Sequence, residues 1–478
     1  MHTLIRYLLD NEKVSLNELI EHSEDNVISK DPANIFQLCF IKLAEAIEKK
    51  EFEPASNSTD VLRRLLTLLL KTQTEFTDPT HIATIFNTLG KIAFSNENNV
   101  HFIRITWPVF EHFLLTFSKT QILEDKTIAT LLEGLGRLKD NDAIPDLGEK
   151  QRILQAQALA LIQSLCESKP SAQATTMAIS GLSRLRMSDL SDKNKEQLDA
   201  LLSTSIQAFM GLEKSAWGES FKPNAQEISN ILYAIAKLSK QGALISSAWQ
   251  TQERQTIIHE LIKLTFKKQP SQHAISQIFY SLGKLAERQC LVPHNDLYWL
   301  MSSLIKYLIH TLSPIDHRTA ITIFTALGRL AERNFLVKDD WQQDNAALLD
   351  KLLKINFTNP HDIADLYLSL GRLAEKDILT LELWDKHKNK ILALIDTFKQ
   401  GPAKEIYKNA FYKGLNKLHL KGFIDQKQND NTNSFNRSPS VSPILDQLRL
   451  TYEDEKPGPS QPTSDKNDST LTQTPTKK

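Results

Sequence analysis

Hydrophobic and polar residues follow a helical period along most of this chain. Between residues 80 and 420 one signature recurs: a residue that is usually small, Leu or Ile, a second such residue, Lys or Arg, and then Leu or Ile. The copies are TLGKI (88–92), GLGRL (134–138), GLSRL (181–185), AIAKL (234–238), SLGKL (281–285), ALGRL (326–330), SLGRL (369–373) and GLNKL (414–418). Apolar positions three and four residues apart predict an amphipathic helix over each copy.

The signature repeats at the length of a two-helix unit. Its central residue recurs every 43 to 53 residues, close to the period of HEAT and armadillo units. A second apolar pattern with a period near 3.6 follows each copy, as in residues 254–266 and 345–357, and short links that often contain Pro precede the next copy. We call the helix with the signature A and the helix after it B. The sequence therefore predicts an all-α fold, a right-handed α-solenoid of about eight to nine two-helix repeats.

The repeat pattern also predicts where the solenoid begins and ends. We expect it over residues 1–424, with 1–60 as an N-terminal cap region that contains a degenerate copy at 34–47. Residues 425–478 are polar and rich in Pro, Ser, Thr and Asn. Such a segment buries too little apolar surface to offset chain entropy, so we expect a disordered C-terminal tail.

Within the A helix, each position relative to the central residue of the signature has its own chemistry. Positions −4, −1 and +2 are apolar and predict the buried stripe. Positions −2 and 0 are small, with Gly recurring although it costs about 1 kcal/mol in a helix interior. The repeated Gly residues predict that another helix backbone lies close against this side.

Position +1 is basic in every copy, and positions −3 and −6 lie on the same face of the helix. One cation and two variable, largely polar side chains per repeat are what a modular reader of single-stranded RNA needs, for a phosphate and a base edge. The basic row consists of Lys91, Arg137, Arg184, Lys237, Lys284, Arg329, Arg372 and Lys417. The candidate base-reading residues are Asn87, Tyr233, Tyr280 and Thr325 at −3, with Asn230, Gln277, Thr322 and Asp365 at −6.

A second interpretation of the basic row stays open at this point. Glu287, Glu332 and Glu375 stand three residues after a row cation and could pair with it inside the protein. Lys plus Arg equals Asp plus Glu at 57 each, so no global positive field favours nucleic acid. The chain would then be a protein-interaction scaffold of the HEAT or armadillo type, with its partner on the concave surface.

Two aromatic patterns have both a functional and a packing interpretation. Trp107, Trp249, Trp341 and Trp384 precede predicted B helices, where they could stack on bases or pack a loop against the next turn; their similar offsets favour packing. His residues recur where A helices begin, which favours helix-start positions over a series of RNA contacts. They are His81, His273, His317 and His361.

No catalytic or cofactor motif is present in the sequence. It lacks a Gly-rich phosphate loop, HExxH, a nucleophile elbow and paired Cys motifs, so we expect neither an enzyme nor a cofactor. Cys39, Cys166 and Cys290 lack metal-ligand spacing and predict buried thiols in a reducing compartment without a metal site. The N-terminus has no secretory-signal pattern, and the apolar run at 65–70 is too short to span a bilayer. We expect a cytoplasmic protein without membrane insertion.

Three segments resemble the octotricopeptide repeat, a family related to the repeats of FAST-kinase-like proteins. Residues 221–238, FKPNAQEISNILYAIAKL, carry the pattern most fully, and 267–285 and 357–373 are similar. The resemblance covers about residues 30–420 and implies an α-solenoid that binds single-stranded RNA sequence-specifically and guides its processing, stability or translation. Bacterial proteins with such repeats resemble effectors secreted by intracellular pathogens, which a polar tail acting as an export signal would suit.

The chain departs from that family in three respects. Its units are longer than the thirty-eight residues of the family repeat, the aromatic slot holds Phe, Tyr or Leu in place of Trp, and no RAP module follows the repeats. The longer unit changes the expected spacing of nucleotides, and the missing module argues against intrinsic cleavage of RNA.

Overall fold

The structure is a computed structural model, and it describes most of the predicted repeat region. The described residues are 39–41, 43–44, 62–63, 65–66, 78–95, 97–117, 123–145, 148, 150–214, 222–310, 315–336, 342–401 and 405–425. The predicted N-terminal cap region, apart from a few isolated positions, and residues 426–478 of the predicted tail lie outside them. The chain divides into two units, Met1–Phe423 and Ile424–Lys478, and the helices described below belong to the first.

Every secondary-structure element among the described residues is a helix, as the periodicity predicts. The A helices are α5 (Pro79–Ser95), α7 (Asp125–Asp140), α9 (Ala172–Arg184), α11 (Ala225–Lys240), α14 (Gln272–Glu287), α16 (His317–Glu332), α18 (Pro360–Glu375) and α20 (Glu405–Leu420). The B helices are α6 (Glu97–Phe117), α8 (Lys150–Glu167), α10 (Asp192–Gly211), α13 (Gln252–Lys267), α15 (Asn295–His310), α17 (Gln342–Leu353) and α19 (Leu381–Gln400). Two short helices, η2 (Leu212–Lys214) and α12 (Ser246–Trp249), occur in loops beside B helices.

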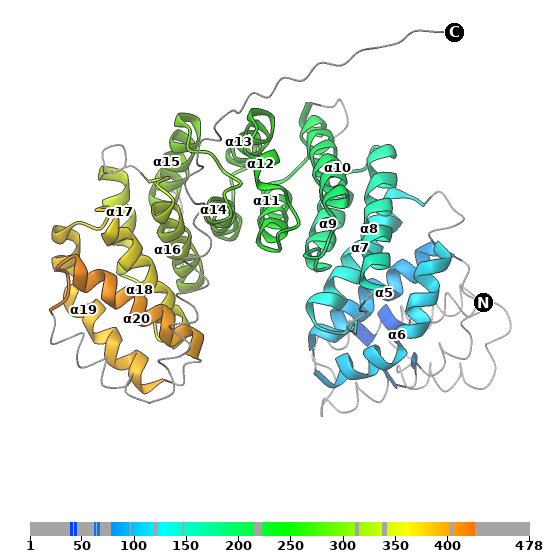
Figure 1. The fold of residues 1–478 in the computed structure, drawn as a ribbon, viewed down its shortest axis with the longest axis horizontal. Helices are drawn as coiled ribbons and strands as arrows, with labels where there is room; N and C mark the ends of the chain where they lie inside the picture. The colour runs from blue at the N-terminus through cyan, green and yellow to red at the C-terminus, as the bar shows by residue number, and fades with distance from the viewer. Residues whose placement is uncertain are drawn as a thin grey trace, which may run out of the picture. The chain divides into compact units, whose positions relative to one another are not determined.

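The helices stack in two layers. Consecutive A helices, such as α14 and α16, pack side by side along their length, while consecutive B helices, such as α15 and α17, contact one another less closely (Figure 1). This arrangement confirms an all-α solenoid of two-helix repeats, with seven complete units and the A helix of an eighth among the described residues.

The predicted buried stripe is confirmed almost throughout. All residues at positions −1 and +2 are buried, and so are those at −4 in the first seven units. The eighth unit differs, because Tyr412 at −4 is half-buried and its neighbour Phe411 is fully buried instead. Phe411 stacks on Phe398 of α19, with ring centroids 3.9 Å apart.

The small residues at −2 and 0 bring neighbouring A helices into backbone contact, as predicted. A Cβ on Gly136, at position 0 of the second unit, would lie 2.4 Å from the carbonyl oxygen of Gly181, at −2 of the next. A Cβ on Gly371 would lie 2.7 Å from the carbonyl oxygen of Gly414 in the same relation. Position 0 of one unit therefore packs against position −2 of the following unit, which fixes the spacing of the A layer.

Most A helices end in the same way. Residues six positions after the signature centre adopt a positive φ, such as 57° at Gln289 and 60° at Asn334. The next amide then donates to the carbonyl of position +2, as Cys290 does to Leu285 at 2.8 Å. This left-handed cap closes the last turn and directs the chain towards the B helix.

The Trp residues pack inside the fold. Trp107, Trp249 and Trp384 are 2 % exposed or less, which excludes stacking on bases and confirms the packing interpretation. Trp249 precedes α13 as predicted, but Trp107 lies well inside α6 and Trp384 in the first turn of α19, so the prediction that these two precede their B helices is wrong. Trp341 lies outside the described residues.

Candidate binding surface on the A helices

The face of the A helices that carries positions +1, −3 and −6 lies opposite the buried stripe; we call it the A-layer surface. Its side chains are packed against one another across the repeats. The rings of Tyr233 and Tyr280 are 5.3 Å apart, and Gln277 accepts hydrogen bonds from Gln226 at 2.9 Å and Ser229 at 2.8 Å. The predicted base-reading residues that the structure finds half-buried here are Asn87, Asn230, Tyr233, Gln277, Tyr280, Thr322, Thr325 and Asp365.

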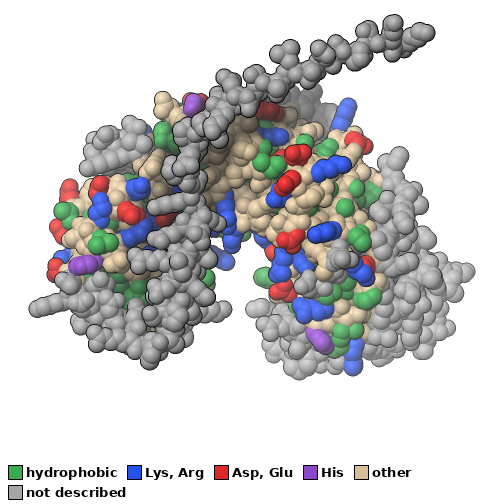
Figure 2. Space-filling model, in the orientation of Figure 1, with side chains coloured by type: hydrophobic (Ala, Val, Ile, Leu, Met, Phe, Trp, Pro, Cys, Tyr) green, Lys and Arg blue, Asp and Glu red, His purple; other side chains and the backbone are tan. Residues whose placement is uncertain are grey.

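The structure brings the basic row together along this surface but pairs most of its cations with carboxylates. Arg329 lies 3.3 Å from Glu287, and Arg372 lies 3.0 Å from Glu332. Lys417 is paired in the same way with Glu375. In each case the carboxylate belongs to the unit before the cation, at position +4. Figure 2 shows Lys and Arg side chains interspersed with Asp and Glu side chains over the face in view.

Burial changes the titration of these groups in the middle of the row. It lowers the pKa of Lys284 and that of Arg329, since both charged side chains are largely withdrawn from water. Burial alone would raise the pKa of Glu287, but the hydrogen bond from Lys284 at 2.7 Å and the nearby cations lower it overall. Arg329 also lies 5.6 Å from the ring centroid of Tyr280. Each of these charges is therefore already compensated within the protein.

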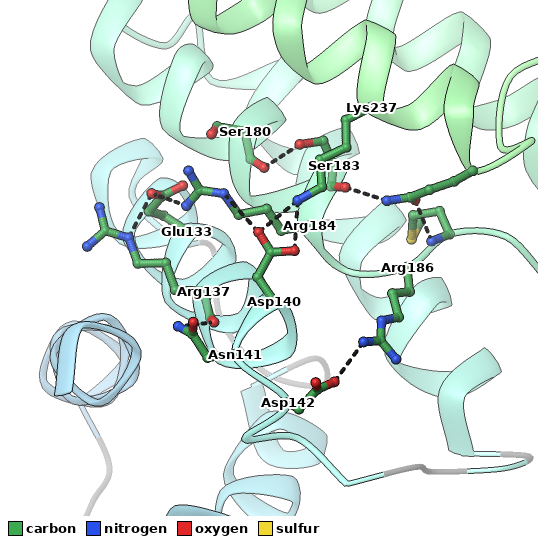
Figure 3. Close-up of polar contacts among 12 residues, drawn as sticks. Glu133, Arg137, Asp140, Asn141, Asp142, Ser180, Ser183, Arg184, Arg186 and Lys237 are labelled. Atoms are coloured by element: carbon green, nitrogen blue, oxygen red, sulfur yellow. Dashed lines mark hydrogen bonds and ion pairs between the residues drawn. The ribbon is translucent and has the colours of Figure 1, made fainter. Parts of the chain in front are cut away.

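The cations of the second to fourth units form one cluster (Figure 3). Glu133, which is 5 % exposed, lies 2.9 Å from Arg137 and 2.7 Å from Arg184 through the same oxygen, Oε1. Asp140 lies 2.7 Å from Lys237, two units further on, and 3.8 Å from Arg184. Two carboxylates thus hold three cations from three successive A helices.

A groove opens beside this cluster. Its volume is about 980 Å³, and it is lined by Ala44 and by residues of α5, α7, α9 and α11, including Lys91, Arg137, Arg184 and Lys237. The carboxylate of Asp140 and the rings of Tyr233 and Phe94 also line it. Phe94 is 82 % exposed, a large value for an aromatic side chain. Lys91 is exposed and, among the described residues, forms no ion pair.

Part of this charge arrangement was not predicted from the sequence. The predicted pairing of a cation with an acid three residues later in the same helix occurs in Lys284 with Glu287. Asp140, which occupies the same +4 position as Glu287, and the buried Glu133 at −3 were not predicted as partners. Counting acidic residues at +4 in all units would have found Asp140, whereas the pairing across units needs the register of adjacent helices.

No group of His, Cys, Asp and Glu residues within the described part of the chain could hold a metal ion. The described cysteines are free thiols; Cys39 and Cys290 are buried, while Cys166 is half-buried and so departs from the prediction. The four recurring His residues all stand in the first turn of an A helix, as expected. In the part of the chain that the structure covers, we find no helix with the length and apolar character to cross a bilayer.

Comparisons with known proteins do not identify the chain. No protein-family model matches it, and no curated protein matches it. A solved structure described as a circular tandem repeat protein with novel repeat topology and enhanced subunit contact surfaces is 12% identical, and the match covers 82% of this chain and 99% of that one. Its TM-score of 0.22 is too low for the likeness to support an argument.

Proposed function

We propose that this protein is a helical-repeat scaffold that binds a protein partner on the A-layer surface. The observation that carries the proposal is the pairing of the basic row: seven of its eight cations are held by carboxylates of the described residues. A surface of mixed charge, half-buried Tyr rings and amide groups suits a protein, which presents donors, acceptors and apolar groups together.

Sequence-selective RNA binding, the other interpretation of the basic row, requires cations available to phosphates. A phosphate that approaches Arg329 or Arg372 would have to displace Glu287 or Glu332, exchanging one ion pair for another with little net gain. The five carboxylates along the row would also repel a polyanion that followed it.

The test is a parallel selection with the full chain at physiological salt, using a displayed random peptide library and a random single-stranded RNA pool. We expect the selection to enrich peptides. Their affinity should fall about tenfold for the Tyr280→Ala variant, because the Tyr280 ring is half-buried within this surface and packs on Tyr233. Leu368→Ala, at −3 of the seventh unit, is expected to weaken the same peptides.

Trp299→Ala is the matched control for this experiment. It also removes a large apolar side chain, 66 % exposed, but from α15 in the B layer, so peptide binding should stay unchanged. If defined RNA sequences are enriched whose binding depends on Tyr280, and no enriched peptide depends on it, the scaffold function is refuted in favour of RNA binding.

A further inference from the structure

The groove between α5 and α11 differs in charge from the rest of the A-layer surface. Four row cations line it, and among the described residues Glu133 and Asp140 are the carboxylates that pair with them, so two positive charges remain in excess there. From the fifth to the eighth unit, four cations face the three carboxylates at +4 and the half-buried Asp365. The row is therefore balanced in the last four units, where the exposed Lys413 at −3 adds one charge, and the larger positive excess among the described residues lies at the first four units.

Several donors in the groove have no partner among the described residues. Arg137 uses only its Nε to bind Glu133, which leaves both terminal nitrogens of the guanidinium without a bond to described residues. Arg184 binds Glu133 through Nη1, and the Lys91 ammonium forms no ion pair there. These N–H groups can donate hydrogen bonds to the carboxylates of a ligand, and the cost of removing water from them is small because all three side chains keep contact with water.

The same site also offers an acceptor and apolar surface. The carboxylate of Asp140 lines the groove and lies beside Lys237 and Arg184, so it is the acceptor that a ligand can reach. Phe94 and Tyr233 add two aromatic rings. A ligand that fits all of these groups must carry negative charge, hydrogen-bond donors and apolar side chains together.

We infer that this groove binds a short acidic segment of the protein partner in an extended conformation. Four adjacent helices at about 8–10 Å spacing make a site of roughly 25–30 Å, the length of about eight extended residues. A peptide can place carboxylates on Lys91 and Arg137 and donate backbone N–H groups to Asp140. RNA carries a negative charge at every nucleotide and would place a phosphate against the carboxylate of Asp140, which repels it. The peptide is therefore the better match. The inference rests on the scaffold function and names the chemistry of its partner.

The test measures fluorescence anisotropy of the full chain with three labelled probes: an octapeptide of alternating Glu and Ala, its Lys and Ala counterpart, and an eight-nucleotide uridine RNA. We expect the Glu peptide to bind and the Lys peptide not to bind. Lys91→Glu should weaken the Glu peptide by about tenfold or more. The side chain is exposed, so the substitution leaves the fold unchanged.

Lys413→Glu is the matched control, since it makes the same charge change at an exposed −3 position of α20, on the same surface but outside the groove. Its effect should stay below about twofold. Arg137→Gln, which keeps a polar side chain at the groove, should weaken binding as Lys91→Glu does.

Each other outcome overturns the inference. Tighter binding of the RNA than of the Glu peptide, with the same dependence on Lys91, would make the groove a polyanion site. Equal losses in Lys91→Glu and Lys413→Glu would mean general charge attraction. Failure of the Glu peptide, while selected peptides still bind in a Tyr280-dependent way, would refute the acidic ligand and leave the scaffold function standing.

Discussion

At the scale of single residues, Gly at the helix contact decides how closely two repeats approach. Gly181 shows this most clearly, because a Cβ there would lie 2.3 Å from the carbonyl oxygen of Leu132, an atom of the neighbouring backbone. The sequence predicted this closeness from the repeated cost of Gly in helix interiors. It could not say which helix approached, since that depends on packing across about 45 residues of chain.

We predict that Gly181→Ala lowers the free energy of unfolding by about 1–3 kcal/mol, because the backbones must separate to admit the methyl group. Thermal unfolding followed by circular dichroism measures the effect. Gly211→Ala is the control: it adds the same methyl group at the end of α10, with nothing within 4 Å, and should be neutral or stabilise by up to about 1 kcal/mol.

His259 on α13 is expected to make the stability of the protein depend on pH. Burial lowers its pKa below the usual 6.5, and Asp296, His294, Lys263 and Glu260 supply the nearby charges. Because the unfolded chain takes up the proton first, stability should fall as pH falls below about 6.5 towards the folded pKa. His259→Gln should reduce this loss.

Melting temperatures between pH 7 and pH 5 measure that difference. His310→Gln, which removes an exposed imidazole at the end of α15, is the control and should follow the wild type. An unchanged pH dependence in His259→Gln would show that another group causes the loss.

At the scale of helices, the ion pairs between units are the part of the candidate site that could not be predicted from the sequence. The rows, the buried stripe and the helix order followed from a period of 3.6 and a repeat length. The partner of Arg372 did not, because Glu332 stands 40 residues earlier and only the packing of α16 against α18 brings the two together. Helix patterns predict what lies on a face, and the register between helices decides which charges meet.

We predict a measurable coupling between these two residues. A double-mutant cycle with Arg372→Gln and Glu332→Gln should give a coupling free energy of about 1 kcal/mol, since the Arg372 side chain is only 13% exposed. Arg186 and Asp142 are the control pair: they lie 2.7 Å apart but are 58% and 62% exposed, and their coupling should stay below about 0.5 kcal/mol. Equal couplings for both pairs would contradict a structural role for burial of the row.

At the scale of the whole molecule, the paired row should make any attraction to nucleic acid weak and only mildly dependent on salt. In a plot of log binding constant against log salt concentration, each phosphate that a protein cation neutralises on a single strand contributes about −0.7 to the slope. Eight free cations would give a slope near −6, whereas the two excess charges of the groove give about −1.4.

We therefore predict a slope shallower than about −2 for a labelled oligouridine titrated between 50 and 200 mM salt. Lys91→Glu should flatten it further, and Lys413→Glu should leave it nearly unchanged. A slope near −6 would show that the carboxylates do not hold the row in solution, and it would favour the RNA-binding function.

In the last four units the +4 acid of one unit pairs with the +1 cation of the next, so these ion pairs would be kept if a unit were copied. A unit of this kind adds one positive and one negative charge, and its acid meets the cation of whichever copy follows. Duplicating it would lengthen the stack without altering the isoelectric point or leaving a carboxylate stranded inside.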